Sequence, residues 1–154
     1  MDKDRLNRWL SLAASLGVLA GIVLLVFELE QNREMMRAQT RNEVSVQLVD
    51  LLSQVATSDK LSSLLVRTES GEPLSVEESN RFLHRALAMF RYFENVHYQY
   101  RQGMYDEEEF SAQLEAWRRF VTNTTYVSVW CAWRETFSPE FRMELEALFS
   151  THTC

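Results

Sequence analysis

Hydrophobic side chains are unevenly distributed along the chain, and the densest run lies near its N-terminus. From Trp9 to Phe27 no residue is charged, and Ser11 and Ser15 are the only polar ones. As an α-helix this run is about 28 Å long, close to the roughly 30 Å hydrocarbon core of a bilayer. So long an apolar surface is hard to bury in a small domain. The pattern predicts a transmembrane helix over residues 9–27, preceded by a short charged tail over residues 1–8.

A cleaved signal peptide is the competing interpretation of this run. The apolar region of a signal peptide spans only about 7–15 residues and is followed by a small-residue cleavage site. Here the apolar run is longer, and the segment Glu28–Asn32 offers no such site. We therefore expect an uncleaved anchor.

The helical pattern continues beyond the apolar run. Residues 29–57 contain neither Gly nor Pro, and apolar side chains recur there at helical spacing, namely Val44, Leu48, Leu51 and Val55. The sequence thus predicts that the transmembrane helix continues without a break into a long amphipathic helix over residues 28–57. Together the two would measure about 70 Å if straight. The backbone stays helical while its surroundings change from lipid to headgroup to water.

Helix-start and helix-stop signals divide the rest of the chain. They predict helices over about residues 60–67, 76–102, 106–137 and 139–150. Ser75 and Glu78 have the spacing of a capping box, and Gly103 occupies the usual position after a helix end.

Two other segments affect this division into helices. Residues 68–74, with Gly71 and Pro73, should be the most exposed and mobile connection. The weak helix formers at 122–125 allow a kink. No segment alternates like a strand. We expect an all-α protein in which a single N-terminal transmembrane helix leads into an antiparallel helical bundle, with residues 28–154 as the soluble domain.

The inner faces of the predicted helices are rich in aromatic residues. The first long helix of the bundle carries Phe82, Ala86, Met89, Phe93, Val96 and Tyr100 at helical spacing. The tryptophans Trp117, Trp130 and Trp133 lie on later stripes, and we expect them in the core and not in a ligand cage. The last helix carries Phe141, Leu145 and Leu148.

The charge balance limits the classes of partner. The formal net charge is −6, and residues 28–154 carry all of the negative excess. An acidic domain argues against broad nucleic-acid binding. Three basic residues precede the span (Lys3, Arg5, Arg8) and three follow it (Arg33, Arg37, Arg41), so charge leaves the orientation open.

The two cysteines, Cys131 and Cys154, match no metal-ligand motif, and we expect no disulfide framework from them. On that basis we expect the soluble domain on the cytoplasmic side.

Two sets of side chains suggest interactions at the membrane. Arg33, Arg37 and Arg41 recur every four residues and could hold lipid phosphates or an acidic partner. The alternative is a solvated stripe paired with Glu30 and Glu34.

The second set comprises Ala13, Gly17 and Gly21, also spaced by four residues. Small residues at this spacing let helices approach closely in lipid, so we expect this face to pack on another helix, most simply a second copy. Glu28 falls on the same face at the membrane boundary, where a ring of copies could line a cation-conducting pore with acid. The alternative is that Glu28 simply reaches the headgroups.

Arg91 and His97 are separated by five residues in "RYFENVH". This spacing resembles the Arg-x(4–6)-His signature of the HEPN helical-bundle ribonucleases, in which Arg and His of paired subunits activate the RNA 2′-hydroxyl. The resemblance implies a membrane-tethered ribonuclease or defence effector that uses Arg91 and His97. The alternative is that His97 is a structural residue of its helix.

Other chemistry has no motif in the chain. The sequence contains no Glu-x-x-His, no EF-hand loop and no Gly-rich phosphate loop. We therefore predict no metal site and no cofactor, and infer no small-molecule substrate.

Two longer stretches carry a broader resemblance. "WLSLAASLGVLAGIVLLVFELEQNREMMRAQT" and "ENVHYQYRQGMYDEEEF" are similar to segments of a loose group of bacterial proteins with one N-terminal transmembrane helix and a helical soluble domain. The resemblance implies the bacterial inner membrane and no particular activity. The sequence favours a non-enzymatic single-pass membrane protein that self-assembles or docks on a larger membrane complex, with the ribonuclease as the alternative.

Overall fold

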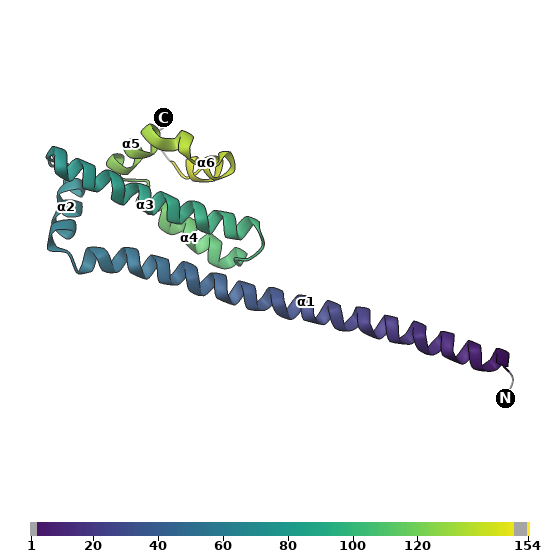
Figure 1. The fold of residues 1–154 in the computed structure, drawn as a ribbon. Helices are drawn as coiled ribbons and strands as arrows, with labels where there is room; N and C mark the ends of the chain where they lie inside the picture. The colour runs from purple at the N-terminus through teal and green to yellow at the C-terminus, as the bar shows by residue number, and fades with distance from the viewer. Residues whose placement is uncertain (1–2, 150–153) are drawn as a thin grey trace. The chain divides into compact units, whose positions relative to one another are not determined.

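The computed structural model describes residues 3–149 and 154, and the secondary structure in this part of the chain is entirely helical. The helices are α1 (Lys3–Ala56), α2 (Asp59–Glu69), α3 (Val76–Arg101), α4 (Glu107–Phe120), α5 (Thr124–Trp133) and α6 (Pro139–Glu146), with a 3-10 turn η1 (Arg134–Thr136) before α6 (Figure 1). The predicted all-α class is confirmed.

Helix α1 is continuous from the charged start of the chain through the apolar run and beyond it. It begins at Lys3, so residues 3–8 of the expected charged tail are helical, and residues 1–2 lie outside the described part. The predicted absence of a break after Phe27 is confirmed. The helix ends one residue before the expected Thr57, whose hydroxyl donates back to the Ser53 carbonyl at 2.7 Å.

By their internal contacts, the residues form two compact units, Met1–Gln39 and Thr40–Cys154. The boundary falls within α1. The second unit, called the helical domain below, contains the last part of α1 together with α2 to α6. Val44 of α1 is buried in its core, and Leu48 and Leu51 pack against that core.

Helix α2 and the connection after it are longer and better held than expected. Ser58 caps α2 by accepting a hydrogen bond from the Leu61 N–H, and the helix runs two residues beyond the predicted end at Arg67. Thr68, assigned to the loop by the sequence, is a buried residue of α2. Gly71 then takes a φ of +69°, a left-handed conformation that suits glycine at a helix end.

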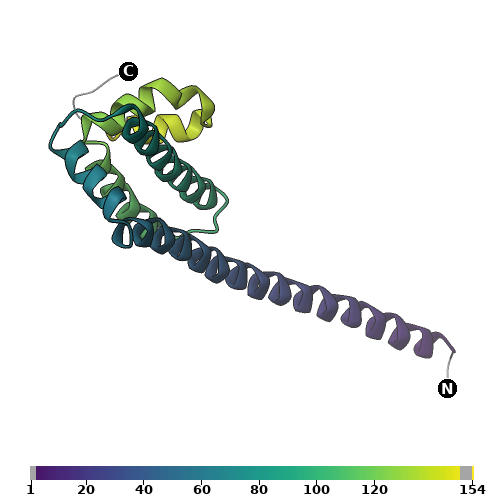
Figure 2. The ribbon, with the colours of Figure 1, turned by 60° about the vertical axis from the view of Figure 1, so that its left-hand side comes forward.

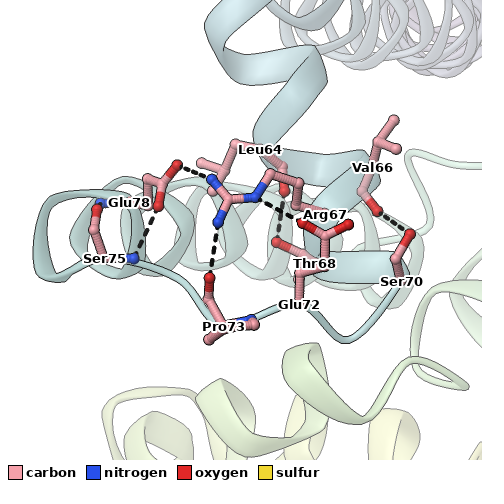
Figure 3. Close-up of polar contacts among 9 residues, drawn as sticks. All are labelled: Leu64, Val66, Arg67, Thr68, Ser70, Glu72, Pro73, Ser75 and Glu78. Atoms are coloured by element: carbon pink, nitrogen blue, oxygen red, sulfur yellow. Dashed lines mark hydrogen bonds and ion pairs between the residues drawn. The ribbon is translucent and has the colours of Figure 1, made fainter.

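The Arg67 guanidinium bridges this connection (Figure 3). It donates to the Pro73 carbonyl at 2.8 Å, to Glu72 at 3.1 Å, and to Glu78 in the first turn of α3. Glu78 also accepts from the Ser75 N–H at 2.8 Å, which completes the predicted capping box. Hydrogen bonding to Ser75 is the largest cause that lowers the pKa of Glu78, and Arg67 adds to it. The connection is therefore tied down through a single arginine.

Helix α3 is the central element of the helical domain, because α2, α4, α5 and α6 all contact it (Figures 1 and 2). Gly103 ends it at a φ of +69°. The Gly103 N–H donates to the Tyr100 carbonyl at 2.9 Å and the Met104 N–H to the Gln99 carbonyl at 3.0 Å. These two bonds make a Schellman motif and confirm the predicted helix end.

The single helix expected over residues 106–137 is wrong. After Phe120 the chain turns, and Asn123 caps the new helix α5 by accepting from the Thr125 N–H at 2.9 Å. Threonine and asparagine lose little by leaving a helix and gain side-chain bonds to the backbone there. The kink that the sequence allowed at 122–125 is a full break, and a second break follows at η1.

The last helix is shorter than expected. Pro139 starts α6 at the predicted position, and the helix ends at Glu146 and not near 150. Phe141, Leu145 and Leu148 are buried as predicted. Residue 150 lies outside the described residues.

The core of the helical domain is built from aromatic rings. Trp117 and Trp130 are 0% exposed, as expected, but Trp133 is 41% exposed and its assignment to the core is wrong. The Phe93 and Trp117 rings stack at 4.8 Å, and Phe90 packs against Trp130 at 5.2 Å. Trp133 is the last residue of α5, and the helical spacing that placed it inward stops there.

Candidate functional site

The apolar segment of α1 is exposed throughout. Within the described residues α1 is the one helix long and apolar enough to cross a membrane, and none of its most apolar stretch is buried. Trp9 and Phe27, at the ends of the run, are both largely exposed. An apolar surface of this extent needs a covering of lipid or protein.

The small-residue face lies on this segment. Seen down the helix axis, Ala13, Gly17 and Gly21 fall at about 0°, 40° and 80°, and Glu28 at about 60°. All four residues are exposed. A Cβ added at Gly17 or Gly21 would meet no atom within 4 Å. The helix therefore presents a shallow face that a second helix can approach.

The three arginines after the span have different surroundings. Arg41 belongs to the helical domain, where its Nε lies 2.6 Å from the Glu109 carboxylate in the first turn of α4. This pair ties α1 to α4, so Arg41 has a structural partner. Arg33 and Arg37 lie in the first unit and are exposed.

Arg91 and His97 do not form a shared site in the chain. Arg91 is on the surface, where its guanidinium bonds Glu94 at 2.6 Å and the Thr136 carbonyl at 3.0 Å and covers the Phe137 ring at 4.0 Å. These contacts join α3 to η1. Six residues apart on a helix, the two side chains point about 120° away from each other.

His97 lies in the core. It is 5% exposed, with its ring 5.8 Å from that of Phe141 and 6.1 Å from that of Phe110. Burial lowers its pKa, because the charged imidazolium loses hydration. A histidine covered in this way has no access to an RNA phosphate, so the geometry favours the structural interpretation.

Cys131 and Cys154 form a disulfide. The expectation that they make no disulfide framework is wrong. Cys131 is in the last turn of α5, and the bond attaches Cys154 to it across 23 residues of sequence. Two cysteines without a spacing motif carry no signal for pairing, since only the folded chain brings their Cα atoms within 5.3 Å.

A cavity of about 430 Å³ lies within the helical domain, lined by residues of α1 to α5. One part of its lining is apolar, with Leu52, Val55 and Leu65. The polar part consists of Glu69, Arg85, Arg119, Asn123 and Tyr126. The sequence analysis did not identify this site.

Arg85 is the unusual residue of the cavity. Its side chain is 9% exposed, and its Nη1 is buried without a hydrogen-bond partner. Burial lowers the pKa of Arg85 and raises that of Tyr126 to about 12. A signal was present in the sequence, because Arg85 interrupts an apolar stripe between Phe82 and Met89. A charged group on that face must either be paired or reach water, because burying it alone is costly.

The described residues contain no group of three or more His, Cys, Asp or Glu side chains arranged to hold a metal ion. No protein-family model, curated protein or solved structure matches this chain.

Proposed function

We propose that the chain is a single-pass membrane anchor that carries a helical domain and acts by association, with itself or with a larger membrane complex. The observation that carries this proposal is the fully exposed apolar segment of α1 with its open face at Gly17 and Gly21. In lipid, packing between small residues drives helix association.

The structure of the helical domain favours the non-enzymatic role over the ribonuclease alternative. The histidine expected for ribonuclease chemistry is buried in its aromatic core. Arg33, Arg37 and Arg41 stay the residues proposed to meet lipid phosphates or an acidic partner, and Arg41 also pairs with Glu109. The bacterial inner membrane remains the proposed location.

The disulfide supports placing the domain on the oxidising side of the membrane. Disulfides persist in the periplasm and outside the cell, and are rare in the reducing cytosol. The expectation of a cytoplasmic domain depended on the absence of a disulfide, and the Cys131–Cys154 bond removes that basis. With the basic residues balanced on the two sides of the span, the bond is the stronger signal.

The association is tested by substituting the open face. Gly17→Leu together with Gly21→Leu should convert the assembly to monomers in mild detergent and in bilayer crosslinking, because two large side chains keep the backbones apart. The matched control is Ser15→Leu with Val26→Leu, which adds bulk on the opposite face and should leave the assembly intact. Glu28→Gln should change cation conductance only if the assembly has a lumen.

A wild-type chain that is monomeric in both experiments would end the self-association proposal. The orientation is tested separately by alkylating the thiols of acid-quenched cells with a maleimide-polyethylene glycol. We expect no modification without reductant. Full modification of Cys131 and Cys154 would return the domain to the cytoplasmic side.

A further inference from the structure

The Arg85 cavity has no part in anchoring or assembly as proposed above. Buried arginines are rare in proteins unless they are paired, because an uncompensated charge loses its hydration. Arg85 is 9% exposed, and its Nη1 is buried without a hydrogen-bond partner. Arg85 is also one of the residues that line the open cavity, so a ligand there would meet its side chain.

The other polar groups of the cavity suit an anion. Arg119 adds a second positive charge, and Glu69 one negative charge, so the lining keeps a positive excess. Because the pKa of Tyr126 is raised to about 12 by burial, its hydroxyl stays protonated at neutral pH and can donate. Asn123 uses its Oδ1 to cap α5, and the NH₂ of the same amide can also donate.

The apolar lining defines the rest of the ligand. Leu52 and Val55 of α1 and Leu65 of α2 line the same cavity as these donors. Its volume of about 430 Å³ is within the range of small-molecule sites, roughly 300–1,000 Å³. An inorganic ion would leave most of this space and its apolar wall uncovered.

We propose that the cavity binds a small amphiphilic anion, with its carboxylate or phosphate head on the Arg85 guanidinium and its apolar body against Leu52, Val55 and Leu65. A guanidinium offers two parallel N–H donors that match such heads. An uncharged molecule of the same shape would bind much more weakly, because Arg85 would stay buried and unpaired.

Glu69 is the carboxylate of the cavity lining that could pair with the Arg85 guanidinium in place of a ligand. It lines the same cavity, but the Nη1 of Arg85 remains unbonded in its presence. Its carboxylate repels an anionic ligand. Replacing it by Gln should therefore tighten binding of the ligand several-fold, and this sign separates a ligand site from an internal ion pair.

The test uses the full chain in phosphatidylcholine nanodiscs and three probes of equal chain length, octanoate, octyl phosphate and 1-octanol. Isothermal titration calorimetry should show saturable binding of at least one anion, with octanol weaker by at least about tenfold. The ratio of the two anion affinities then identifies the head group. Equal affinities for octanol and both anions, or no saturable binding of either anion, would overturn the proposal.

Variants test whether Arg85 is the residue that binds the anion. Arg85→Met should weaken anion binding by at least about tenfold and, without ligand, melt no lower than the wild type, because it removes an unpaired buried charge. Arg118→Gln removes one charge from an exposed α4 residue paired with Glu115, so it should bind the anion like the wild type. Unchanged binding in Arg85→Met, or equal losses in both variants, would exclude the assigned site.

Discussion

Two tryptophans with equal burial and different hydrogen bonding provide a sharp test of the core. Trp117 and Trp130 are both 0% exposed. The Trp130 Nε1 donates to the Glu146 carboxylate at 3.1 Å, whereas the Trp117 Nε1 is buried without a partner. We consider the same substitution at both positions, Trp to Phe. It shortens each side chain by a similar amount and removes the indole N–H from each.

The expected difference follows from the two N–H groups. The loss of apolar contact and the cavity formed are similar at both positions and cancel to a first approximation. Trp130→Phe loses a hydrogen bond to a charged group, worth about 1.5 kcal/mol because Glu146 is partly exposed. Trp117→Phe removes an unpaired buried donor and recovers about 1 kcal/mol. Trp130→Phe should thus be the less stable variant by about 2.5 kcal/mol.

Glu146, which loses its indole partner in Trp130→Phe, does not change the order of the two stabilities. Arg134 Nε lies 3.3 Å from the same Glu146 oxygen, although its geometry is that of an ion pair without a hydrogen bond. Glu146 therefore keeps a charged neighbour after Trp130→Phe. The lost hydrogen bond is therefore worth about 1.5 kcal/mol, the lower end of the range for bonds to charged groups.

The measurement is thermal unfolding of the full chain in mild detergent, followed by near-ultraviolet circular dichroism. At about 4 °C per kcal/mol for a domain of this size, the melting temperatures of the two variants should differ by roughly 10 °C. The alanine variants of both residues serve as controls and should each cost about 3–5 kcal/mol. Equal melting temperatures for the two Phe variants, or a lower one for Trp117→Phe, would refute the assignment of the two N–H groups.

The remaining predictions concern pH, the disulfide and the loop. Because burial depresses the pKa of His97 in the folded state, the unfolded chain binds its proton first as pH falls below about 6.5, so stability should decline from there towards the folded pKa. His97→Gln should flatten this part of the profile of melting temperature against pH, and an unchanged slope would assign it to other groups. Reducing the Cys131–Cys154 bond should cost about 3 kcal/mol by loop entropy, measured in urea with and without reductant, and Cys154→Ser should lose sensitivity to reductant. Arg67→Ala should speed proteolysis at residues 70–75, because the bonds to Glu72, Glu78 and the Pro73 carbonyl disappear; cleavage inside α3 ahead of the loop would contradict the helix bounds.

Local patterns in the sequence determined where most helices begin and end. The capping box at Ser75, the glycine at 103 and the proline at 139 each act on the backbone of their own turn, so their effect is independent of the rest of the molecule. The continuity of α1 through the change from apolar to charged residues follows from the same local rule. The exposure of the apolar run was also predictable, since no part of so small a domain could cover it.

The break between α4 and α5 and the surface position of Trp133 depended on more than the local pattern. The helical spacing in the sequence continues through Asn123. In the folded chain the side chain of this residue accepts a hydrogen bond from the Thr125 N–H and starts a new helix there. Stripe position alone then misplaces Trp133, because the helix that defined the stripe ends at that residue.

Only the tertiary structure decided the chemistry of individual side chains. Arg91 and His97 share a spacing, but the packing of α4 and α6 against α3 buries the histidine and leaves the arginine on the surface. The disulfide and the Arg85 cavity likewise need residues from distant parts of the chain to meet. Helix formation depends on neighbours within about four residues, which the sequence displays directly. Burial, pairing and cavity shape depend on which helix faces meet in space, and a periodic pattern contains no record of that choice.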